Sequence, residues 1–121
     1  MTKEYFETKV KQPALDKWAQ GAKKSRYRIF EWWCEKGDKP CGFCKTFKDC
    51  SVCPVADEGA NEANCRSEFS ELGKLMNDAS AFDLRLPTIM LKRPHRRAVK
   101  LCKGMRKAIS KVKYDPAWAN I

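Results

Sequence analysis

The chain has few aliphatic side chains and almost no histidine. Leu, Ile, Val and Phe together account for 22 of its 121 residues, and His95 is the only histidine. Together with a net charge of +10, so small an apolar fraction is typical of disordered chains, because too little surface is buried to offset chain entropy. A single histidine and the lack of paired carboxylates in a recognisable setting argue against acid–base catalysis. We therefore do not expect an enzyme.

Long apolar runs are also missing. No stretch approaches the roughly 18 apolar residues that a membrane span needs, and residues 1–7 contain no apolar segment typical of a secretion signal. We therefore expect a protein of the cytoplasm that does not bind membranes. The length favours one domain over residues 1–121, because domains usually have about 100–150 residues.

Apolar periodicity predicts a mainly α fold, a small helical domain around a central cysteine-rich loop. We expect a tryptophan-rich helix over 14–35, a second helix over 62–79 and a basic helix over 94–114. Residues 82–86 alternate apolar and polar side chains, which allows one short strand or hairpin. The expected core comprises Trp18, Trp33, Phe69, Leu72, Met76, Leu101, Met105 and Ile109, and we expect Trp118 to fold back onto it.

The cysteines give the strongest chemical signal, in a segment over 41–65 that we expect to be irregular up to residue 60. Cys41 and Cys44 are separated by two residues, as are Cys50 and Cys53, and Cys65 follows further along. Two such turns can aim four thiolates at one cation in the tetrahedral shell that zinc prefers. The spacing allows two ligand sets: both pairs, or Cys41 and Cys44 with Cys53 and Cys65.

We expect one Zn²⁺ that supports the fold, since a zinc site can replace part of a missing apolar core. Four thiolates also suit an iron–sulfur cluster, which is the chemical alternative. A thioredoxin-type redox pair is less favoured, because that motif follows a strand whereas a helix is predicted here. Cys34 and Cys102 fall at apolar helix positions, where we expect small buried side chains.

Positive charge is concentrated after residue 90. Residues 91–121 carry ten basic side chains and one acidic side chain, and most of the basic ones lie on the predicted helix. Regularly spaced Lys and Arg can neutralise successive phosphates of a nucleic acid, and Lys23, Lys24, Arg26 and Arg28 would widen that surface. An acidic protein surface and a merely solvated face are the alternatives. The proposed binding residues are Lys92, Arg93, Arg96, Arg97, Lys100, Lys103, Arg106, Lys107, Lys111 and Lys113.

Eight positions between about residues 30 and 66 form a recognisable pattern: Trp32, Trp33, Cys41, Cys44, Cys50, Cys53, Pro54 and Cys65. This pattern resembles a group of small uncharacterised bacteriophage proteins. The resemblance implies a viral zinc-binding accessory protein that acts in the cytoplasm of the host. We predict a nucleic-acid-binding protein; the alternative is an inhibitor of a host enzyme or defence system, of the anti-CRISPR type, that docks its basic helix on an acidic surface.

Overall fold

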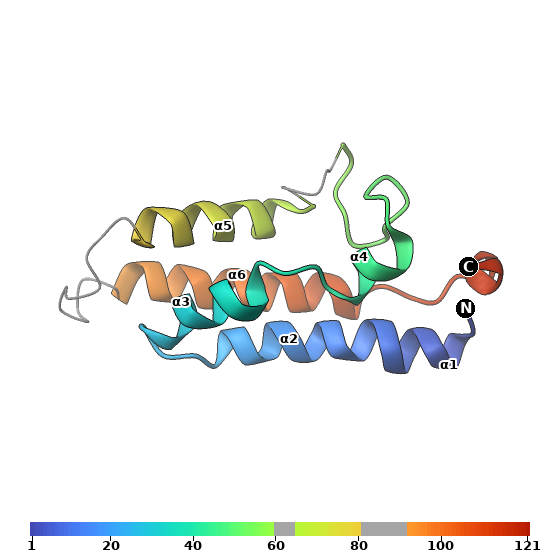
Figure 1. Cartoon of the computed structure of the whole chain (residues 1–121), viewed down its shortest axis with the longest axis horizontal. Helices are drawn as coiled ribbons and strands as arrows, with labels where there is room; N and C mark the ends of the chain where they lie inside the picture. The colour runs from blue at the N-terminus through green and yellow to red at the C-terminus, as the bar shows by residue number, and fades with distance from the viewer. Residues whose placement is uncertain (60–64, 81–91) are drawn as a thin grey trace.

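The computed structural model describes residues 1–59, 65–80 and 92–121, and the mainly α prediction is confirmed. The long helix α6 (Lys92–Ser110) lies between α2 (Gln12–Ala22) and α5 (Ser67–Ser80) and packs against both (Figure 1). None of the described residues forms a strand, and the strand or hairpin predicted over 82–86 lies outside them.

The first helical rod begins well before the predicted helix. It comprises α1 (Lys3–Tyr5), a π-helical segment η1 (Phe6–Lys11) and α2, which follow one another without a break. Pro13 lies where α2 starts, and proline has no N–H and crowds the carbonyl four residues earlier. A π turn accommodates this defect: the Gln12 N–H donates to the Glu7 carbonyl, five residues back.

The single helix predicted over 14–35 is wrong. The chain turns after Ala22 and returns as α3 (Arg28–Trp32) and a second π-helical segment, η2 (Trp33–Gly37), which ends close to the predicted end at residue 35. The reason is the Trp32 ring, which packs directly on Gly21: a Cβ there would lie 2.5 Å from the ring atom Cη2. Glycine thus lets the returning segment close onto α2.

The buried core confirms the predicted set, with Phe69 half-buried at its edge. Trp118, in the short helix η4 (Pro116–Asn120), folds back as expected, with its ring centroid 5.1 Å from that of Phe6. The two termini meet there, because the Met1 ammonium donates to the Ile121 carbonyl at 2.7 Å. Aromatic rings therefore provide much of the apolar contact that the few aliphatic side chains do not.

Two helix boundaries differ from prediction. Helix α5 starts at Ser67, whose N–H donates to the Asp57 carboxylate at 2.9 Å, so Cys65 precedes the helix; residues 62–64 lie outside the described part. Helix α6 ends at Ser110, before residue 114. The carbonyl of Val112 instead accepts a hydrogen bond of 2.8 Å from Lys11 Nζ, and the non-helical chain beyond carries Trp118 to Phe6.

Candidate functional site

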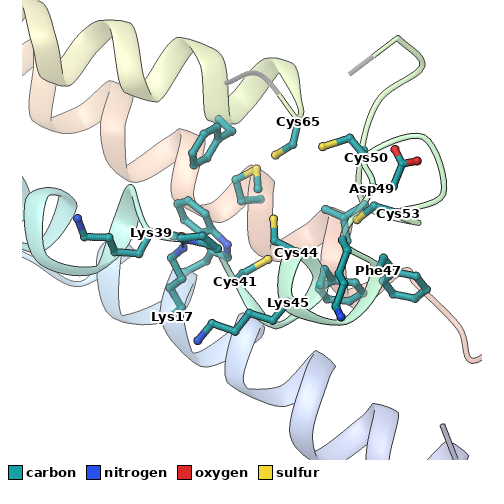
Figure 2. Close-up of a pocket in the computed structure, with 18 of the residues that line it drawn as sticks. Lys17, Lys39, Cys41, Cys44, Lys45, Phe47, Asp49, Cys50, Cys53 and Cys65 are labelled. Carbon is teal, nitrogen blue, oxygen red and sulfur yellow. Dashed lines mark hydrogen bonds between the residues drawn. The ribbon is translucent and has the colours of Figure 1, made fainter. Parts of the chain in front are cut away.

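Five cysteines line one pocket of about 480 Å³: Cys41, Cys44, Cys50, Cys53 and Cys65. Figure 2 shows their sulfur atoms turned toward a common space. They come from three segments: the start of α4 (Gly42–Phe47), the loop after it, and the residue pair before α5. The helix α4 corrects the expectation that the whole segment up to residue 60 is irregular. All five candidate ligands are thus brought together, so both predicted ligand sets are represented in the pocket.

The first cysteine pair is fixed to the body of the protein by the two residues between its members. The Phe43 side chain is completely buried, with its ring 6.0 Å from that of Phe6 in an edge-to-face contact. At Gly42, a Cβ would lie 2.9 Å from the Val10 carbonyl oxygen, so only glycine allows this close approach of α4 to η1. Cys41 and Cys44 therefore project from an anchored turn.

The other cysteines are joined by hydrogen bonds between their segments. Lys48 ends α4 with a φ of 60°, which reverses the chain toward Cys50. Beyond Cys53, the Asp57 N–H donates to the Cys65 carbonyl at 2.7 Å, and Arg66 donates to the Val55 carbonyl at 2.9 Å. These bonds hold the loop after Cys53 beside the start of α5.

The pKa of Cys41 lies well below the usual range of a thiol. A hydrogen bond with the Cys44 thiol lowers the pKa of Cys41 to about 6; burial opposes this shift, and backbone N–H groups of α4 and the nearby Lys17 charge assist it. The same bond raises the pKa of Cys44, because its proton is shared with the Cys41 thiolate. One proton is thus held between two sulfur atoms that a metal ion would bind in its place.

The remaining thiols affect one another electrostatically. Burial raises the pKa of Cys65 to about 11, and the negative charges of Cys41, Cys53 and Cys50 add to this rise. Burial likewise raises the pKa of Cys53, and Cys41 and Cys50 add to it. Thiolates that repel one another across a shared pocket are a donor set suited to a soft cation, which removes the repulsion by binding them.

The positions of the thiols do not yet form a coordination shell. Within the described part of the chain, no three His, Cys, Asp or Glu side chains are arranged to hold a metal ion. The thiol donors therefore fit zinc chemically. To coordinate one zinc ion, however, the segments that carry the cysteines would have to move closer together. Zinc binding remains a prediction.

One wall of the pocket is formed by Lys17 and Trp18 of α2, which the sequence did not identify. The Lys17 Nζ donates to the Lys39 carbonyl at 2.7 Å and lies 4.8 Å from the centre of the Trp18 ring. Burial lowers the pKa of Lys17, and the thiolate charges of Cys41 and Cys44 oppose that shift. Trp18 is 1% exposed, and its indole N–H has no hydrogen-bond acceptor among the described residues.

The two cysteines assigned to apolar helix positions behave differently. Cys102 is completely buried, as predicted, and burial raises its pKa to about 12. Cys34 is exposed on η2, so the prediction that it is buried is wrong. The turn at residues 23–27 restarts the helical register, so spacing counted from α2 no longer indicates which face Cys34 occupies.

The basic residues of α6 and of the segment after it form a second candidate site. All ten predicted binding residues are exposed; eight of them lie on α6, outside its buried stripe of Ala98, Leu101, Met105 and Ile109, and Lys111 and Lys113 follow its end. Within the described residues, Arg97 is the only one of the ten with an ion pair: its guanidinium donates twice to Glu71, each bond 2.6 Å long. We call these ten side chains the basic surface.

The turn between α2 and α3 lies beside the start of the basic surface. His95 Nε2 is 2.7 Å from the Lys24 carbonyl oxygen, which joins α6 to that turn. Lys23, Lys24 and Arg28 are exposed there, Arg26 is half-buried, and Arg28 lies 3.7 Å from Glu31. The predicted extension of positive charge beyond α6 is thus compatible with the structure.

Comparison of the chain with protein-family models, curated proteins and solved structures found no match. Among the described residues, no helix is both long enough and apolar enough to cross a membrane. The thiol pocket and the basic surface are therefore the features that bear on its function.

Proposed function

We propose that this chain is a small zinc-binding protein that binds nucleic acid through the basic surface and acts by binding rather than by catalysis. The observation that carries the proposal is the exposure of ten basic side chains, of which Arg97 alone has an ion pair among the described residues. Like charges gathered at this density repel one another, and an anionic polymer relieves that repulsion.

The spacing along α6 suits a phosphate backbone. Arg96, Lys100, Lys103 and Lys107 follow one another at three- and four-residue steps, so they share one line along the helix. A rise of about 1.5 Å per residue spaces them roughly 4.5–6 Å apart along the helix axis. Such a row contacts several phosphates and carries no base specificity by itself.

The thiol pocket supports this surface by stabilising the domain. Zinc would draw four thiolates to about 2.3 Å and replace the proton shared by Cys41 and Cys44. Closing this shell would pull the loop after α4 and the start of α5 toward α2, and α5 packs on the side of α6. The resemblance to phage proteins suggests that the nucleic acid is encountered in a bacterial host.

Binding to nucleic acid is expected at low salt and should weaken steeply as salt is added. Each phosphate that the basic surface neutralises contributes a slope of about −0.9 to the logarithm of affinity against the logarithm of salt concentration for duplex DNA. Titrations of labelled duplex and single-stranded DNA of random sequence, followed by fluorescence anisotropy at several salt concentrations, measure this slope. Absence of binding to either at low salt would overturn the nucleic-acid proposal and favour an acidic protein surface as the partner.

A further inference from the structure

We infer that Lys17 and Trp18 complete the zinc centre from outside the thiolate shell. The Lys17 ammonium offsets the negative charge of the metal–thiolate group, and the Trp18 indole N–H donates to one of its sulfur atoms. The inference rests on the proposed zinc site and assigns roles to two residues that the cysteine pattern does not contain.

The negative charge of a zinc–thiolate group supports the role of Lys17. Four thiolates around Zn²⁺ leave a net charge of −2, and a charge enclosed by protein requires an opposite charge or hydrogen-bond donors nearby. Lys17 is half-buried in the pocket wall and interacts electrostatically with Cys41, Cys44 and Cys65. The other lysines that line the pocket, Lys39, Lys45 and Lys48, are exposed at its rim.

The position of Lys17 is fixed. Its Nζ is held by the Lys39 carbonyl and by the face of the Trp18 ring. Three N–H bonds are available to an ammonium group, and the Lys39 carbonyl uses one of them. Asp38 also attracts Lys17, but less strongly than Cys41, Cys44 or Cys65 does.

An orphaned donor supports the role of Trp18. Buried N–H groups are nearly always hydrogen-bonded, yet the buried N–H of Trp18, a residue that lines the pocket, has no acceptor among the described residues. A thiolate sulfur drawn inward by zinc provides that acceptor. Trp32 also has a buried N–H without a described acceptor, but Trp32 does not line the pocket and serves as an internal control.

The Lys17→Met variant tests the charge role, because methionine keeps an unbranched side chain and removes the ammonium. We expect zinc affinity, measured by competition with a chromophoric chelator, to fall by about 10- to 100-fold, as for other groups that support metal ligands. Lys17→Arg should retain most of the affinity, and Lys36→Met, which removes an exposed lysine outside the pocket, should match the wild type. The thermal midpoint of the metal-free protein should not fall in Lys17→Met, since a purely structural role would lower it with or without metal.

Replacing Trp18 with its benzothiophene analogue tests the hydrogen bond, because sulfur takes the place of the indole N–H while the ring shape is kept. We expect a shift of the thiolate-to-metal absorption band of the cobalt-loaded protein and about 10-fold weaker zinc binding. The same analogue at Trp32 should leave both unchanged. An unchanged band and affinity at Trp18 would overturn its role.

These measurements distinguish failure of the zinc site from failure of the roles of Lys17 and Trp18. A wild-type chain that binds no zinc would overturn both the zinc site and the roles of Lys17 and Trp18. A wild-type chain that binds zinc, with Lys17→Met binding it equally well, would overturn the role of Lys17 alone.

Discussion

Replacing Cys44 with serine is expected to abolish tight zinc binding and to unfold residues 41–59. Cys44 belongs to both predicted ligand sets, so a switch from one set to the other cannot compensate for its replacement. Structural zinc supplies about 10–16 kcal/mol of apparent binding free energy in small zinc peptides, which is more than the few buried side chains of this segment provide. Hydrogen exchange read by mass spectrometry should show loss of protection there and retained protection in α2 and α6.

Two comparisons control this prediction. Cys34→Ser removes a thiol that is exposed and outside the pocket, and it should bind zinc and resist exchange as the wild type does. Treating the wild type with a strong chelator should reproduce the exchange pattern of Cys44→Ser. Full protection of residues 41–59 in the metal-free protein would contradict a structural role for the metal.

Reversing the charge of Arg96, Lys100, Lys103 and Lys107 to glutamate is expected to abolish nucleic-acid binding. The four residues form one exposed line on α6, and the substitutions turn attraction to phosphates into repulsion. Replacing the same four with alanine should leave weak binding, with a salt slope lower by about one for each phosphate that is no longer neutralised. Arg97 is left unchanged, because reversing it would place a carboxylate against Glu71 and disturb the packing of α5 on α6.

A control with equal net charge separates the basic surface from overall charge. Lys3, Lys9, Lys36 and Lys74 are exposed on α1, η1, η2 and α5, outside the thiol pocket, and reversing them changes the net charge by the same amount. Circular dichroism of both quadruple variants should show the same helical content as the wild type. Equal weakening by the two quadruple variants would show that net charge, and not the basic surface, determines binding.

The sequence predicts most reliably those features that depend on local periodicity. The stripe of Leu101, Cys102, Met105 and Ile109 follows helical spacing, so the buried face of α6 and the exposed basic face opposite could both be predicted. The cysteine spacing likewise identified the residues that gather in one pocket. In each case, neighbours in sequence determine the outcome.

Features that depend on distant contacts were missed. From the sequence, Gly21 is only a position that weakens a helix. In the structure the Trp32 ring packs on it, and this contact determines where α2 ends. The exposure of Cys34 follows from the same turn. Lys17 and Trp18 line the same pocket as the thiols because α2, α4 and the start of α5 converge there. The residue spacing in the sequence does not indicate this convergence.

The zinc-to-chain ratio of the protein, purified under reducing conditions and measured by elemental analysis, decides whether the thiol pocket is a metal centre. One zinc per chain is the predicted result, and it should disappear in Cys44→Ser. A protein without bound metal, or one that contains iron and sulfide in place of zinc, would contradict the proposed site.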